Sequence, residues 1–152
     1  EFKTLAEGGD ATAQFNVALL YYQGQGVQRD YEDALNWFIK AALQGHPLAQ
    51  FNVGYMYEKG EGTPQDYVEA AKYYRQAAER GNQLAQFNLG YLYEKGQGVL
   101  PDEVQALMWY NLAAIQGENK ARAARDRITV WMTPAQIAEA QRLAREFELV
   151  EN

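Results

Sequence analysis

The sequence predicts an all-α protein: a right-handed α-α superhelical solenoid of antiparallel helix pairs, 36 residues per pair, with a C-terminal capping helix. One short segment recurs every 36 residues, first as Ala13–Asn16, then as Ala49–Asn52 and again as Ala85–Asn88. Glycines recur at the same spacing, at places where helices should end. A fixed period of this length indicates stacked helical hairpins that share one continuous core.

The repeat is present in three full copies. Leu48–Gly62 matches Leu84–Gly98 at 12 of 15 positions, which chance does not produce. Residues 1–9 align with the second helix of a repeat, so we expect the chain to begin in the middle of one. We therefore predict a single solenoid domain over 1–152, divided into a partial repeat 1–10, repeats 11–46, 47–82 and 83–118, and a degenerate repeat with the capping helix at 119–152.

Each repeat is predicted to hold two helices, and the second repeat shows why. Residues 48–59 contain no proline and carry apolar side chains at helical spacing. Gly60 should end this helix, because glycine adopts the positive φ of a C-terminal cap without a Cβ penalty. Asp66 is a candidate N-cap for the next helix, 67–80, whose alanines and tyrosines form one broad apolar face. Gly81 should end that helix in turn.

A further helix is predicted after the third repeat. Thr133 and Pro134 supply an N-cap and a first-turn proline for a helix that runs to about Glu148. This helix has a single apolar face, which suits a cap that closes the stack. Trp131 and Met132 are expected to fill the joint before it.

The composition argues against catalysis. The chain has no cysteine, no serine and one histidine, so nucleophilic catalysis by serine or cysteine is excluded and a zinc site has too few ligands. We expect no catalytic residue, no metal, no cofactor and no enzymatic activity. His46 follows a turn glycine and is expected to be a plain surface residue.

The net charge of -6 disfavours nucleic acid as a partner, and no apolar run is long enough for membrane insertion. The absence of cysteine leaves the compartment open, since it fits both the cytoplasm and the periplasm. Basic residues gather near the C-terminus on one helix of mixed charge, where we expect a solvated face, with binding of an acidic segment as the alternative. They are Lys120, Arg122, Arg125 and Arg127.

These features resemble the Sel1-like repeat family, whose repeats are related to the tetratricopeptide repeat. The pattern Ala-x3-Leu-Gly-x2-Tyr-x2-Gly-x-Gly-Val is met by Ala85, Leu89, Gly90, Tyr93, Gly96, Gly98 and Val99. The segment around Thr133 and Pro134 is similar to the closing segment of bacterial members. The first repeat departs most, with Ala18 in place of glycine. The resemblance implies a bacterial scaffold or adaptor for protein binding. Family members with claimed penicillin-binding or β-lactamase activity are rich in cysteine, which this chain lacks.

The first helix of each repeat should line the concave side of the solenoid and carry the binding site. Asparagine offers a donor and an acceptor to a peptide backbone, and tyrosine offers contact area with a hydrogen bond. By resemblance, the asparagines match the position where peptide-binding tetratricopeptide repeats hold a ligand backbone. The candidate partner-binding residues on the concave face are Asn16, Asn52, Asn88, Tyr55, Tyr91, Phe51, Phe87, Tyr22, Glu58 and Glu94.

Other roles remain open for these residues. The asparagines could equally well form hydrogen bonds with the loop or helix of the next repeat. Apolar residues at helical spacing, such as Phe51 and Phe87, more often pack in a core. Glu58 and Glu94, each followed by a lysine, are expected to be solvated.

For the whole protein, the leading hypothesis is a scaffold that binds a peptide or protein on its concave face. The alternatives are a structural spacer in a longer array and, less favoured, a β-lactamase-like hydrolase. The N-terminal end, which lacks half a repeat, is a candidate surface for self-association.

Overall fold

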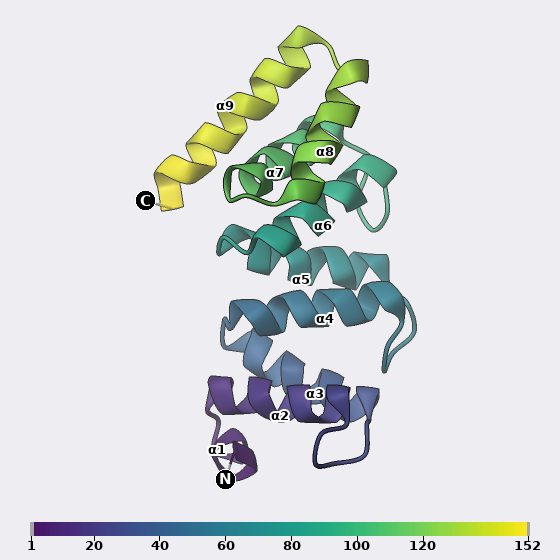
Figure 1. Ribbon diagram of the computed structural model, residues 1–152, viewed down its shortest axis with the longest axis vertical. Helices are drawn as coiled ribbons and strands as arrows, with labels where there is room; N and C mark the ends of the chain where they lie inside the picture. The colour runs from purple at the N-terminus through teal and green to yellow at the C-terminus, as the bar shows by residue number, and fades with distance from the viewer. Residues whose placement is uncertain (1, 152) are drawn as a thin grey trace.

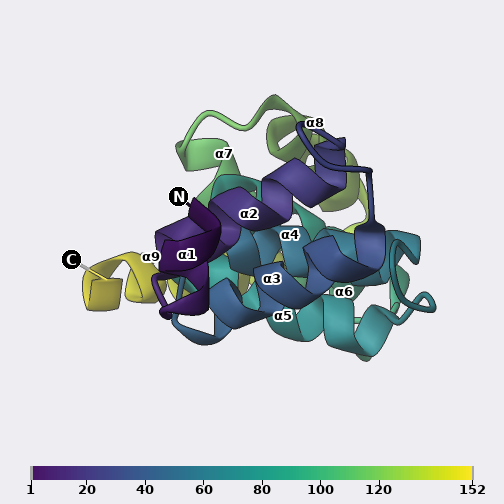
Figure 2. The same ribbon diagram turned by 90° about the horizontal axis from the view of Figure 1, so that it is seen from below.

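The computed structural model describes residues 2–151, and the side chains of residues 3–150. Over this range the protein is all-helical and has no strand. The helices stack along one long axis, as Figure 1 shows from the side and Figure 2 from one end, and from α1 to α8 each packs against its neighbours in sequence. They are α1 (Phe2–Glu7), α2 (Ala11–Gln23), α3 (Tyr31–Leu43), α4 (Pro47–Lys59), α5 (Tyr67–Glu79), α6 (Gln83–Lys95), α7 (Glu103–Ile115), α8 (Asn119–Ile128), the 3-10 turn η1 (Thr129–Trp131) and α9 (Pro134–Glu151). The predicted solenoid of 36-residue helix pairs is confirmed. Glu1, in the predicted partial repeat, lies outside the described residues.

Glycine and aspartate set the ends of each hairpin, as the sequence predicts. Gly60 closes α4 with a φ of 71°, and its backbone N–H donates to the Met56 carbonyl. Asp66 opens α5, because its carboxylate accepts a hydrogen bond of 3.1 Å from the Glu69 backbone N–H. The same cap pairs recur in the first and third repeats as Gly24 with Asp30 and Gly96 with Asp102.

Within a hairpin, glycine lets the first helix approach an aromatic ring of the second. A Cβ atom added at Gly54 would lie 2.6 Å from the Tyr74 ring, and one added at Gly90 would lie 2.8 Å from the Tyr110 ring. Both rings are fully buried. The tyrosines therefore form the centre of the second and third repeats and fix how closely their helices pack.

Between repeats, a row of buried glutamines joins each first helix to the second helix before it. Their side-chain amides donate hydrogen bonds of 3.1 to 3.2 Å to backbone carbonyls eight residues earlier. A buried amide needs such a partner, so each bond also fixes the register between neighbouring repeats. The glutamines are Gln14, Gln50 and Gln86, and the carbonyls belong to Ala6, Ala42 and Ala78.

Helix α9 turns back and packs against α7, where the Phe147 ring meets the Trp109 ring edge-on at 5.4 Å between centroids. Met132 is buried at the joint, as expected, but Trp131 is 82% exposed, so the prediction that both fill the joint is wrong for Trp131. The reason is local: η1 ends at Trp131, the backbone becomes extended at Met132, and it is the Met132 side chain that packs in the core with Ile128. The last helix also runs further than Glu148, to Glu151.

His46 has a structural role that differs from the expected one. Its Nδ1 atom accepts a hydrogen bond of 3.2 Å from the Ala49 backbone N–H, which makes it the N-cap of α4. Its ring also stacks on Phe15, with 4.6 Å between centroids. The prediction of a plain surface residue is therefore wrong, because the side chain satisfies a helix end.

Candidate functional site

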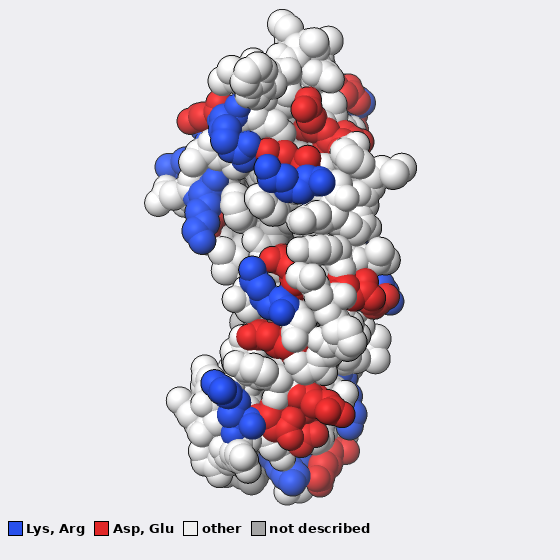
Figure 3. Space-filling model, turned by 90° about the vertical axis from the view of Figure 1, so that its right-hand side faces the viewer, with Lys and Arg blue, Asp and Glu red and all other residues white. Residues whose placement is uncertain are grey.

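A hollow of about 290 Å³ lies between the first helices of the first two repeats. Its walls are mainly aromatic and apolar, with two amide side chains among them. Figure 3 shows that the molecule is bowed, with its outline hollowed at mid-height along one edge. A hollow of this size and lining suits an apolar side chain with polar groups at its rim. The lining residues are Leu19, Tyr22, Gln23, Phe38, Phe51, Asn52, Tyr55 and Met56.

The predicted site residues differ in how much of each reaches solvent. Tyr55 and Tyr91 are 36% and 42% exposed, whereas Phe51 and Phe87 are half-buried and pack on the core. The Phe51 ring lies 5.8 Å from the Tyr74 ring, and the Phe87 ring lies 5.7 Å from the Tyr110 ring, centroid to centroid. The asparagines Asn16, Asn52 and Asn88 are half-buried.

Tyr22 joins the first repeat to the second. Its hydroxyl donates a hydrogen bond of 2.9 Å to Glu61, in the loop that follows α4. Burial raises the pKa of the Tyr22 phenol, and the Glu61 carboxylate raises it further. The phenol therefore stays protonated and continues to donate.

Glu58 and Glu94 are not simply solvated, so that expectation is wrong. The buried Tyr74 hydroxyl donates to Glu58 Oε1 at 2.9 Å, and the buried Tyr110 hydroxyl donates to Glu94 Oε1 at 2.7 Å. Burial raises the pKa of both phenols, with a further contribution from the neighbouring glutamate. The second and third repeats thus each present a tyrosine–glutamate pair, in which a phenol from the second helix orients a carboxylate at the end of the first.

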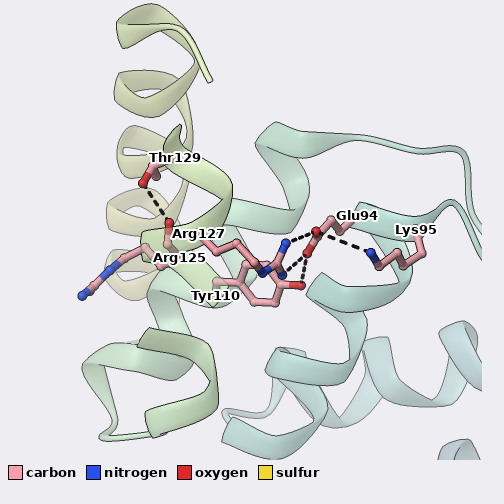
Figure 4. A network of polar contacts seen from close by, with 6 residues as sticks. All are labelled: Glu94, Lys95, Tyr110, Arg125, Arg127 and Thr129. Atoms are coloured by element: carbon pink, nitrogen blue, oxygen red, sulfur yellow. Dashed lines mark hydrogen bonds and ion pairs between the residues drawn. The ribbon is translucent and has the colours of Figure 1, made fainter. Parts of the chain in front are cut away.

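The pair in the third repeat is bound by an arginine of the chain itself. Figure 4 shows Arg127 from α8 reaching the Glu94 carboxylate, with Nη atoms 2.5 and 2.8 Å from its two oxygens. Lys95 stands 3.9 Å away, and the last turn of α8 is held by the Thr129 hydroxyl, which donates to the Arg125 carbonyl.

The electrostatic effect of this ion pair is mutual. The hydrogen bond from Arg127 lowers the pKa of Glu94 against the opposing effect of burial, and the same bond raises the pKa of Arg127. Arg127 is exposed, as expected of a solvated basic face, but it also pairs with a carboxylate of the chain itself. It lies 36 residues after Tyr91 and so occupies the position that Tyr55 and Tyr91 hold in the second and third repeats. That spacing is the signal that could have identified it.

The described residues contain no group of three or more histidine, cysteine, aspartate or glutamate side chains that could hold a metal ion. None of the described helices has the length and apolar character that a bilayer crossing requires. The surface around the hollow therefore offers a partner aromatic contact area, amide groups for hydrogen bonds and oriented carboxylates.

Comparison with known proteins agrees with this architecture. A family model described as Sel1 repeat matches residues 11–46, 47–82 and 83–118. A Sel1 repeat protein from Oxalobacter formigenes is 39% identical, with a TM-score of 0.77, over 83% of this chain and 95% of that one. A protective antigen of uropathogenic Escherichia coli strains, which displays an SLR fold, is 41% identical, with a TM-score of 0.76, over 79% of this chain and 26% of that one.

One curated relative is a plant protein. The ERAD-associated E3 ubiquitin-protein ligase component HRD3A of Arabidopsis thaliana is 44% identical over 43 residues, which is 28% of this chain and 6% of that protein. The chain therefore spans only a small part of the length of this relative.

Proposed function

This chain belongs to the Sel1 repeat family, and from that premise we propose that it is a scaffold that holds a protein or peptide on its concave face, along the first helices α2, α4 and α6. Sel1 repeat proteins generally mediate protein–protein interactions and are generally non-catalytic. We call the proposed surface the binding face; it comprises the hollow, Tyr55, Tyr91 and the asparagine row Asn16, Asn52 and Asn88.

The observation that carries the proposal is a pair of exposed tyrosines on equivalent turns, one of which lines an apolar hollow. Tyr55 and Tyr91 leave more than a third of their surface in solvent. Tyrosine is enriched at protein interfaces, because a rigid ring buries apolar area while its hydroxyl keeps a hydrogen bond. The half-buried Asn52 also lines the hollow, where its amide would pair with a peptide backbone.

The size of the hollow favours a macromolecular partner over a small ligand. About 290 Å³ holds one or two side chains, at the lower limit of pockets that enclose a whole small molecule. A protein segment would place one apolar anchor there and spread its remaining contacts along the stack. The relative HRD3A, named as a component of a ubiquitin ligase, works within an assembly of proteins, which supports the same kind of role here.

The test is capture of a partner by variants that change only the binding face. We expect Tyr55→Ala combined with Tyr91→Ala to abolish capture of proteins that the wild-type chain retains, with an unchanged helical circular dichroism spectrum. Val68→Ala combined with Leu100→Ala is the matched control, since it removes two exposed apolar side chains outside the binding face. Equal capture by both double variants would remove the proposal.

The proposal also implies that the chain itself catalyses nothing. We expect no turnover of generic ester, glycoside or β-lactam substrates. Turnover that a single carboxylate substitution abolishes would contradict this.

A further inference from the structure

The tyrosine–glutamate pair occurs twice, and its surroundings differ in one respect. In the third repeat the pair Tyr110 and Glu94 binds Arg127, which comes from the next first helix, α8. In the second repeat the equivalent residue of the next first helix, 36 positions earlier, is Tyr91. Tyrosine carries no positive charge, so the second pair has the same oriented carboxylate without the arginine.

The neighbouring lysine does not replace that arginine. Lys59 lies 3.4 Å from Glu58, and Lys95 lies 3.9 Å from Glu94. The third repeat therefore keeps its lysine and binds Arg127 as well. The side chain of Glu58 is 21% exposed, against 12% for Glu94 beneath its arginine. The second repeat thus retains the acceptor and leaves more of it open to solvent.

Building on the proposed function, we propose that Glu58 binds an arginine side chain of the protein partner, in the way that Glu94 binds Arg127. A guanidinium suits this site better than an ammonium, because its fork of N–H groups pairs with both carboxylate oxygens at once. The Tyr74 hydroxyl holds one of those oxygens in place before binding, so little ordering is required. The net charge of -6 favours the approach of a basic segment.

The site also fixes where the partner lies along the stack. Tyr55, at the edge of the hollow, precedes Glu58 by three residues on α4, so the two side chains are neighbours on one helix face. The first repeat has Tyr22 and Phe38 at the positions of the pair and offers no carboxylate there. The Glu58 carboxylate, held by Tyr74 beside the hollow, favours one register for the partner: an apolar anchor in the hollow and an arginine on Glu58.

The experiment selects random peptides from a display library on the intact chain. We expect enrichment of arginine at a fixed distance from an apolar residue, in peptides whose binding is lost in Tyr55→Ala combined with Tyr91→Ala. For a selected peptide, Glu58→Gln should weaken the Kd about ten- to a hundred-fold, the range for losing a charged hydrogen-bonded pair. Glu79→Gln is the matched control and should leave the Kd unchanged, because that exposed carboxylate lies on α5, outside the binding face.

A second measurement changes the peptide. Replacing the peptide arginine by citrulline, which has nearly the same shape without the charge, should weaken the Kd as much as Glu58→Gln does, and the two changes together should add little. Face-dependent peptides without arginine, or equal affinity for arginine and citrulline, would overturn this inference and leave the proposed function standing. Selected peptides that bind equally well to the chain with Tyr55→Ala and Tyr91→Ala would overturn both this inference and the proposed function.

Discussion

Helix caps at single residues show how the repeat tolerates substitution. The N-cap positions of the first helices are Asp10, His46, Asn82 and Glu118, spaced by 36 residues. Each side chain differs, yet each accepts a hydrogen bond from a backbone N–H of the first turn. The position therefore requires an acceptor and not a particular residue. Only His46 makes that acceptor depend on pH near neutrality.

Protonation of His46 is expected to destabilise the protein. Burial lowers its pKa below the ordinary value of 6.5, so as the pH falls the unfolded chain takes up this proton before the folded one. Stability is therefore complete above about pH 6.5 and decreases below it, until the pH passes the folded-state pKa. We expect His46→Asn, which copies Asn82, to remove this decrease between pH 7 and 5 in urea unfolding. His46→Ala should instead cost about 1 kcal/mol at pH 7.5. An unaltered pH profile in His46→Asn would rule out this source.

A different single position leaves a buried acceptor unpaired. In the first repeat the side-chain oxygen of Gln14 accepts a hydrogen bond of 2.9 Å from the Gln44 amide. In the third repeat Gln86 accepts the equivalent bond of 2.8 Å from Gln116. In the second repeat Arg80 replaces that donor, and Gln50 Oε1 is buried without a partner among the described residues.

We expect Arg80→Gln to restore this bond and stabilise the protein by about 1 kcal/mol, the net value of a typical intramolecular hydrogen bond. The midpoint of urea unfolding measures the change. The reverse substitution in the third repeat, Gln116→Arg, is the matched control and should lower the midpoint. A midpoint that does not rise in Arg80→Gln would show that Gln50 is satisfied in another way.

At the scale of elements, the second loop glycine of the second and third hairpins, Gly62 and Gly98, lies against the preceding repeat. Gly26 and Gly62 share a φ of 74°, but only Gly62 touches a preceding repeat: an added Cβ would lie 2.5 Å from the Tyr31 carbonyl oxygen. We expect Gly26→Ala to cost about 1 to 2 kcal/mol for its backbone conformation alone. Gly62→Ala should cost about 1 to 3 kcal/mol more, because the loop must move away from α3. Thermal unfolding of the two variants isolates the inter-repeat contact. Equal losses would show that the contact adds nothing.

The elements could be predicted because their determinants are local. A glycine that closes α4 and an aspartate that opens α5 act within one turn of the chain, and the 36-residue period repeats the signal. The glutamine row was equally readable from its spacing and was missed, because a buried polar residue does not appear in an apolar pattern. His46 was missed for a related reason: the cap row becomes visible only when Asp10 and Asn82 are aligned with it.

At the scale of the whole molecule, sequence reasoning succeeds with the stack and fails with contacts across it. Glu94 and Arg127 are 33 residues apart, and their pairing depends on how α8 packs on α7. Helix periodicity predicts that Glu94 lies on the concave face, but it does not show that the buried Tyr110 hydroxyl donates a hydrogen bond to it. The environment of the binding face therefore emerges only from the assembled repeats.

The same nearest-neighbour assembly predicts how the molecule responds when its C-terminal end is loosened. Phe147 of α9 covers Trp109, so Phe147→Ala should cost about 2 kcal/mol, less than the roughly 3–5 kcal/mol of a fully buried phenylalanine. In a stack whose repeats contact only their neighbours, this loss should reduce amide hydrogen-exchange protection in α7 and leave α2 and α3 protected as before. Leu149→Ala is the control, since that side chain is 77% exposed and should change nothing. A uniform loss of protection from α2 to α7 would instead mean that the stack unfolds as one unit, and the binding face on α4 would then depend directly on the cap.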